Sequence, residues 1–291
     1  VAEATLRAQS SADWGALEPR LQAPDDALVG DLSAFIDRFS DEKVTVGAAV
    51  RVVPLPSLTA ARSALPRAVL AARLVVVEPP PWDGAIANGG ARTPPPTLHR
   101  VSAKRNEIID EARWFGDVGW TLPIAPASEA TAGWRLPTLA RDAAGAAPTS
   151  MGGQPAHHFI VDGERVIGLY GTGASLLLMG IFDAASGELV RAFDFSHWGR
   201  APGALPGDEA FVDQSTRWAA VRDGVLYVSH SHRTYARSSL GHNAYLSALD
   251  LQTGRLLWRS APLVSNTGNF VIDGDWILSG YGFTAEPDWL T

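Results

Sequence analysis

The chain has 291 residues, of which 46% are apolar and 19% are charged, so it can bury a substantial core and global disorder is excluded. Its formal net charge of −7 argues against nucleic acid as a partner, because a phosphate backbone attracts clustered Lys and Arg. No apolar run is long enough to span a membrane, and the absence of cysteine excludes disulfides and thiolate metal sites. Because the sequence starts with Val1, we expect a processed product that is exported to the periplasm or the extracellular space.

The first part of the chain predicts an arm followed by a helix. Residues 1–30 combine Ala, Ser, Pro and charged residues without periodicity, which is typical of an extended arm or linker. Beyond residue 30 the apolar positions repeat as on one face of a helix, with Asp31 as its N-cap. The apolar positions of this face are Leu32, Phe35, Ile36 and Phe39.

A second helix is expected between two β-rich stretches. Residues 57–73 are rich in Ala, although Pro66 would kink this helix or begin another one, because its ring collides with the preceding turn. The flanking stretches, 43–55 and 74–78, are rich in β-branched residues. Residues 31–96 therefore predict an α+β region.

Proline-rich loops end this region. The triplets Pro79–Pro81 and Pro94–Pro96 favour the polyproline II conformation, and the segment between them carries turn residues. Residues 97–150 follow without a clear pattern. A long strand pair, a helix, or strands that belong with the repeats further along the chain are all compatible with them.

The second half of the chain, residues 151–291, contains repeated signals for β-hairpins. Three Asp-Gly dipeptides lie between β-rich runs, where they favour a tight reverse turn because Gly tolerates positive φ. The dipeptides are Asp162-Gly163, Asp223-Gly224 and Asp273-Gly274. After the first two, an Asp and a Gly recur four residues apart, at 183 and 187 and again at 250 and 254. Each unit is expected to hold about four short strands, and the spacing between units is typical of propeller blades.

The stretch ALDLQTGRLLWR, residues 248–259, resembles the repeat of quinoprotein-type (PQQ-like) β-propellers. In that family an Ala, an Asp, a Gly and a Trp at this spacing lock each blade onto the next. The resemblance implies a blade-locking role for Ala248, Asp250, Gly254 and Trp258, with the Trp stacked between blades. The unit at 157–195 departs from the repeat, because Ile181 replaces the Ala and Arg191 replaces the Trp.

These patterns predict a mainly β fold: β-propeller blades of four antiparallel strands, incomplete in this chain, behind a smaller α+β or irregular N-terminal region. If the third unit keeps the spacing of the first two, its second turn falls beyond Thr291, so we expect the last blade to be cut short. An open propeller exposes strand edges. Further sequence or another chain is therefore expected to complete it.

The stretch SHSHRTYARSSLGHNAY, residues 229–245, is the richest in side chains that carry chemistry. His230 and His232 alternate by two, so on a strand both face the same side, and His242 could return from the inserted loop. The three histidines could hold a divalent metal, or they could hydrogen-bond the loops of an insertion that packs across the blade. His157 and His158 are consecutive on a predicted strand, so their side chains are expected to face opposite sides.

The function predicted from these features is an exported binding or scaffold module that recognises a protein or polymer partner without catalysis and needs no cofactor. Its support is that no known catalytic motif is present, while folds of this kind host many functions. One alternative is a metal-dependent enzyme that uses the His230, His232 and His242 cluster. The other is a quinone-dependent dehydrogenase, although the calcium-ligating carboxylates and adjacent cysteines of such family members are not recognisable here.

Overall fold

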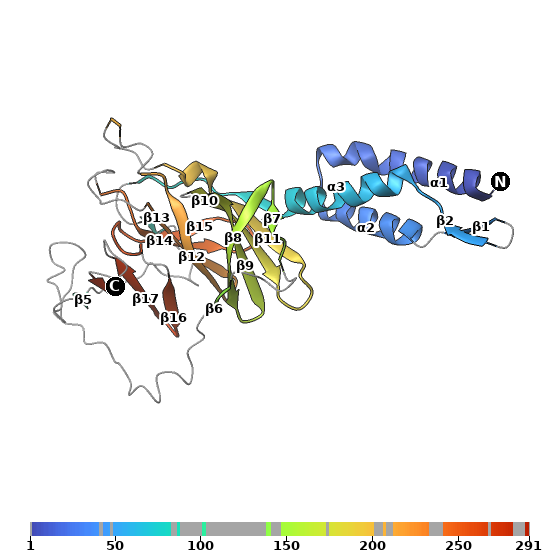
Figure 1. The fold of residues 1–291 in the computed structure, drawn as a ribbon. Coiled ribbons are helices and arrows are strands. Elements are labelled where there is room, and N and C mark those ends of the chain that lie inside the picture. Colours follow the sequence, from blue (N-terminus) through green and yellow to red (C-terminus); the bar gives the residue numbers. More distant parts are fainter. Residues whose placement is uncertain are drawn as a thin grey trace, which may run out of the picture. The chain divides into compact units, whose positions relative to one another are not determined.

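The chain falls into two compact units, residues 1–74 and 75–291 (Figure 1). The computed structural model describes residues 2–40, 43–46, 49–82, 86–87, 101–102, 138–140, 147–172, 175–200, 206–207, 212–232, 241–266, 269–281 and 289–290. The Pro94–Pro96 loop and the insertion at 233–240 lie outside these residues. The division between the units falls at residue 74, so the strand expected at 74–78 belongs to the second unit instead of to a region that ends at 96.

The first unit is a small helical unit with one β-hairpin. Helices α1, α2 and α3 share an apolar core built mainly from Leu, Phe and Ala side chains. The elements are α1 (Ala2–Leu17), the 3-10 helix η1 (Glu18–Gln22), α2 (Asp26–Ser40), the paired strands β1 (Lys43–Val46) and β2 (Ala49–Val52), and α3 (Pro56–Arg73). Residues 2–22, expected to form an extended arm, are therefore helical.

The start of α2 differs from the prediction, although its apolar face is as expected. Phe35 and Phe39 are buried, with their rings 4.8 Å apart. The carboxylate of Asp25 caps the helix by accepting the Leu28 N–H at 2.7 Å, six residues before the expected N-cap. Asp31 lies inside the helix and pairs with Arg20 at 2.6 Å.

The second unit is mainly β, and its described strands form three sheets (Figure 1). The first has the strand order β3-β11-β10-β9-β8-β6, with β7 paired to β8; the second has the order β12-β13-β14-β15-β4; and the third has the order β16-β17-β18-β5. The strands of the first sheet are β3 (Leu74–Val76), β6 (Thr138–Ala140), β7 (Ser150–Met151), β8 (Gln154–Asp162), β9 (Arg165–Thr172), β10 (Ser175–Asp183) and β11 (Leu189–Asp194). Those of the other two are β4 (Ile86–Ala87), β5 (Val101–Ser102), β12 (Ser215–Arg222), β13 (Val225–Ser231), β14 (Tyr245–Asp250), β15 (Leu256–Arg259), β16 (Phe270–Asp273), β17 (Trp276–Tyr281) and β18 (Trp289–Leu290).

Each of the first two sheets is a four-stranded antiparallel meander widened by strands from elsewhere in the chain. The meanders are β8 to β11 and β12 to β15, in chain order. β3, β4 and β5 follow one another between residues 74 and 102, and they add to the last strands β11, β15 and β18 of successive sheets. β3, β4 and β5 are therefore edge strands, and their length of two or three residues leaves only a short edge for another chain to pair with.

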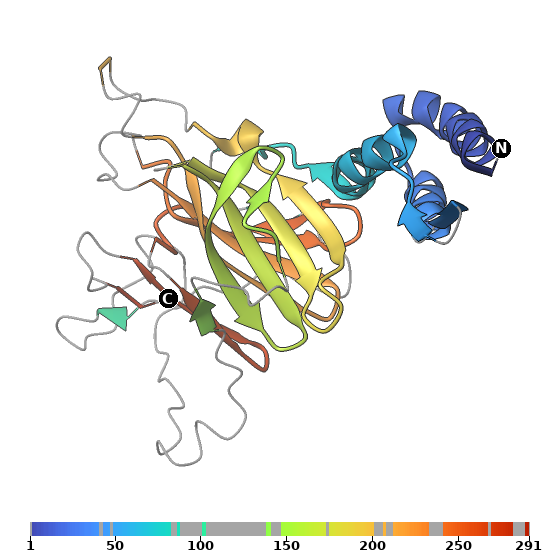
Figure 2. The same cartoon turned by 45° about the vertical axis from the view of Figure 1, so that its right-hand side comes forward.

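The first two sheets are packed against each other through one hydrophobic core. In Figure 2 the strands β8 to β11, green to yellow, lie in front of the orange strands of the second sheet. Ile167, Met179 and Phe193 of the first sheet and Leu226 and Leu249 of the second belong to the same fully buried cluster. The short helix η3 (Ser196–Trp198) adds Trp198 to this core.

All three Asp-Gly dipeptides lie at two-residue turns between antiparallel strands, but not all in the same position. Asp162 pairs with Arg165 and Asp273 with Trp276, so in these two turns the Asp is the last strand residue. In the second hairpin Arg222 pairs with Val225, so Asp223 and Gly224 form the loop, with φ of 50° and 76°. When the first two hairpins are aligned by their strand pairs, Asp162 is equivalent to Arg222 and not to Asp223. The structural repeat therefore differs by one residue from an alignment of the dipeptides.

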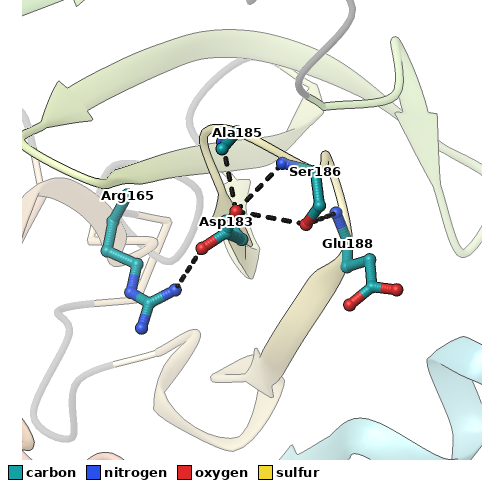
Figure 3. A network of polar contacts seen from close by, with 5 residues as sticks. All are labelled: Arg165, Asp183, Ala185, Ser186 and Glu188. Atoms are coloured by element: carbon teal, nitrogen blue, oxygen red, sulfur yellow. Dashed lines mark hydrogen bonds and ion pairs between the residues drawn. The ribbon is translucent and has the colours of Figure 1, made fainter.

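The Asp-x-x-x-Gly turns have the same hydrogen bonds in both meanders. Figure 3 shows the first, where Asp183 Oδ1 accepts the N–H groups of Ala185 and Ser186 and the Ser186 hydroxyl. In the second turn, Asp250 Oδ1 accepts the same three bonds from Gln252 and Thr253. These N–H groups and hydroxyls, led by the backbone N–H of the Ser or Thr, lower the pKa of both aspartates. The recurring Asp and Gly therefore mark the same hydrogen-bonded turn in both repeats.

The turn after β14 is packed against the edge of the first sheet. Gly254 has a φ of +69°, and a Cβ built on it would lie 2.4 Å from Val75 Cγ1 on β3. Arg191 on β11 occupies the position that Trp258 occupies in the next repeat, and its guanidinium donates to Gln252 Oε1 at 2.9 Å. The residue that replaces the Trp therefore still contacts the following sheet.

The first hairpin also joins the two sheets. The buried Asp162 carboxylate accepts the Val221 N–H at 3.2 Å and pairs with Arg222 at 2.5 Å, both on β12. Asp162 and Arg222 occupy equivalent positions in the two hairpins. The sheets are thus fastened at the β8–β9 turn and at the β14–β15 turn.

The close approach of Gly254 to Val75 gives a stability prediction with a matched control. Gly224 has a similar φ of +76°, but nothing lies within 4 Å of its Cβ position. Gly224→Ala should cost about 1 kcal/mol, which is the backbone strain alone. Gly254→Ala should cost about 1 to 2 kcal/mol more, because the methyl group also displaces Val75. Urea unfolding of both variants measures the difference, and equal losses would contradict the packing role of Gly254.

Candidate functional site

The three predicted histidines lie at one end of the second sheet, which we call the histidine end. Here β12 begins, β13 ends, β14 begins and β15 ends, with Thr216 paired to His230 and His230 paired to Tyr245. The connections 199–214 and 232–244 leave from this end, whereas the opposite end has the two-residue hairpin turn and the Asp250 turn. Long connections carry binding residues more often than short turns do.

His230 is buried among aromatic rings. Its ring centroid lies 4.7 Å from that of Phe195 and 4.8 Å from that of Trp198, and the Thr216 hydroxyl lies 3.1 Å from its Nε2. Burial, together with the nearby positive charge of Arg217, lowers the pKa of His230 to about 3. The imidazole therefore stays neutral at ordinary pH and is not suited to exchange protons in a reaction near neutrality.

His232 and His242 contact other partners. His232 is buried, and its backbone N–H donates to Asn243 Oδ1 at 2.9 Å, which ties the end of β13 to the segment that precedes β14. His242 is half-buried, with its Nδ1 3.5 Å from the Tyr245 hydroxyl. The structure thus brings the three histidines to one end of the sheet and gives each a different neighbour.

A metal centre at this end remains a hypothesis. Within the part of the chain that the structure describes, there is no group of three or more His, Asp or Glu side chains arranged to hold a metal ion. The contacts of His230 fit the second sequence interpretation, in which the histidines hydrogen-bond and pack. The chemistry offered by the described residues is hydrogen bonding and aromatic packing within the protein.

Two residues of the histidine end were not predicted. Arg259 is buried, its guanidinium lies 4.3 Å from the centre of the Tyr245 ring, and it donates to the Pro81 carbonyl. The Tyr245 hydroxyl donates to the Trp82 carbonyl at 2.8 Å. These partners lie more than 160 residues away along the chain, so no local pattern could indicate them. They hold the segment that follows β3 against the histidine end.

The predicted blade-lock residues form a row across the second sheet. Tyr227 pairs with Ala248, and Ala248 pairs with Trp258, so the three side chains share one face of neighbouring strands. The small Ala248 lets the two flanking rings approach to 6.0 Å between centroids. Trp258 is buried within the core. Asp250 and Gly254 form the turn between the strands of Ala248 and Trp258.

The sequence matches no model of a known protein family and no curated protein sequence. The resemblance to PQQ-like repeats therefore depends on the residues and the turn geometry alone. Among the helices that the structure describes, none is long and apolar enough to cross a membrane.

Proposed function

We propose that residues 75–291 form successive blades of a PQQ-like β-propeller, and that the chain is a binding or scaffold module for a protein or polymer partner. The observation that carries this proposal is the repeated turn, together with the contact of its second copy with the preceding sheet. The Asp183 and Asp250 turns share their hydrogen bonds, and the second turn is packed on the edge strands of the preceding sheet through Gly254. Such nearest-neighbour contacts are what an array of blades requires.

The binding role is supported by the way polar side chains are used at the histidine end. The buried His230, Arg259 and Asn243 contact rings, carbonyls and backbone N–H groups of the protein itself. These contacts fix the strand ends from which the connections 199–214 and 232–244 start, so we propose that this end of the sheet contacts the partner.

A site-specific cross-linking experiment tests this proposal. A photo-reactive amino acid is placed at His242, which is half-buried at the histidine end, and separately at Asp223, which is exposed at the opposite end of the same sheet. We expect a cross-linked partner from an extract of the source cells at position 242 and none at position 223.

Two kinds of result would overturn the proposal. The first is absent cross-linking, or equal cross-linking at both positions. The second is evidence for an enzyme: a quinone absorbance band in the purified protein, or a stoichiometric metal ion that is lost in both His230→Ala and His232→Ala. Absorbance and metal analysis of the same preparation detect either one.

A further inference from the structure

Two consecutive histidines on β8 have their rings turned toward each other. The Nδ1 atoms of His157 and His158 are hydrogen-bonded to each other at 2.8 Å, and the ring planes are inclined by 72°. His157 is exposed and His158 is half-buried. Neighbouring side chains on a regular strand face opposite sides, so this arrangement contradicts the expectation from the sequence.

A β-bulge explains how the two rings can meet. Ala156 pairs with Tyr170 and His158 pairs with Leu169, so β8 contains one residue more than β9 between these two pairs. The extra residue is His157. Because a bulge re-aims the side chain of its extra residue, His157 is turned toward the side of His158. Bulges of this kind are common beside functional sites.

We propose that His157 and His158 form a two-nitrogen chelate for a divalent copper ion. The proposal concerns a site on β8 in the first sheet, and it does not depend on the proposed binding function. Water molecules would complete the coordination, because the described residues hold no third His, Asp or Glu positioned with these two.

The two nitrogens are already as close as adjacent ligands of one ion, and both can bind it once the proton that they share has moved to the Nε2 of its ring. Histidine nitrogens bind first-row metals at about 2.0–2.1 Å, so nitrogens 2.8 Å apart subtend about 85–90° at a shared ion. This angle suits two adjacent positions of a tetragonal Cu²⁺ site. A tetrahedral Zn²⁺ ion would need the nitrogens about 3.3 Å apart. Cu²⁺ also binds nitrogen ligands more tightly than the other divalent first-row ions do.

The orientation of His158 agrees with a role as ligand. Its Nε2 is buried without a hydrogen-bond partner, so Nδ1 is the nitrogen that the ring presents to His157.

The test is a titration of the full chain with Cu²⁺ at pH 7, followed by electron paramagnetic resonance. We expect one tightly bound equivalent whose spectrum shows nitrogen coupling. His157→Ala and His158→Gln should each weaken this binding by about tenfold or more, because each removes one of two ligands. His197→Ala serves as the control, since His197 is an exposed histidine elsewhere on the second unit, and it should bind copper like the wild type.

Unchanged copper affinity in His157→Ala would overturn the proposal, and so would Zn²⁺ binding as tight as that of Cu²⁺. Because His157 is exposed, its variant should keep the wild-type urea midpoint, and a folding defect cannot then explain a loss of copper. The cross-linking at His242 is independent of copper, so a failure of either proposal is distinguishable from a failure of the other.

Discussion

Trp258→Ala should destabilise the second unit by about 3 to 5 kcal/mol, the range measured when a large aromatic side chain is removed from a core. Trp258 is only 3% exposed, its ring lies 6.0 Å from that of Tyr227, and its strand β15 is covered on the outer side by β4. The surroundings are strands held in register, so they cannot collapse into the space that the indole leaves. Urea unfolding measures the loss as a lower midpoint with an unchanged slope.

Trp276 is the matched control, because it is a strand tryptophan that is 42% exposed. Trp276→Ala should cost clearly less than Trp258→Ala. Similar losses for the two variants, or a near-neutral Trp258→Ala, would contradict the blade-lock role of Trp258. A double-mutant cycle with Tyr227→Ala then separates the contribution of the ring pair from that of burial alone.

The turns of the repeat could be predicted because their bonds are local. Asp250 accepts hydrogen bonds from residues two and three positions later, and Gly254 supplies the positive φ, so the spacing alone defines the turn. The register of the hairpins could not be predicted in the same way. Whether an Asp ends a strand, like Asp162, or enters the loop, like Asp223, depends on the pairing of the strands and not on the dipeptide.

The helical start of the chain was missed because a polar residue interrupts its apolar stripe. Leu6, Trp14 and Leu17 all pack on the core of the first unit, but the position between the first two is occupied by Ser10. Ser10 is buried, and its hydroxyl is hydrogen-bonded to that of Ser57 on α3 at 3.0 Å. A periodicity argument counts this position as exposed. The partner that makes it acceptable lies 47 residues away.

For the candidate site residues too, the sequence predicts what depends on neighbours along the chain but not what depends on distant segments. The spacing of His230, His232 and His242 along the sequence places all three at one end of the second sheet. The burial of His230, in contrast, depends on Phe195 and Trp198 from another part of the chain. The meeting of His157 and His158 depends on a bulge opposite Tyr170 and Leu169, which the sequence does not mark.

The low pKa of His230 predicts a loss of stability in acid. The folded protein keeps this ring neutral down to a pH of about 3, whereas in the unfolded chain it binds a proton below a pH of about 6.5. Between these two values the unfolded state holds the additional proton, so the free energy of unfolding falls as the pH falls. The stabilisation is fully present above pH 6.5. About 3 kcal/mol of it should be lost between pH 7 and pH 4.

Replacing His230 removes this pH dependence of the free energy of unfolding, even if the variant is less stable than the wild type at pH 7. His230→Phe keeps an aromatic ring between Phe195 and Trp198 but leaves the Thr216 hydroxyl without its imidazole partner, whereas His230→Gln keeps a polar group there. Both variants should lose about 3 kcal/mol less than the wild type between pH 7 and pH 4. The titration of His158 is common to all three proteins and cancels in the comparison. If urea unfolding shows that the wild type and both variants lose the same free energy of unfolding between pH 7 and pH 4, the ring is protonated in the folded state. His230 is then not enclosed as the structure places it.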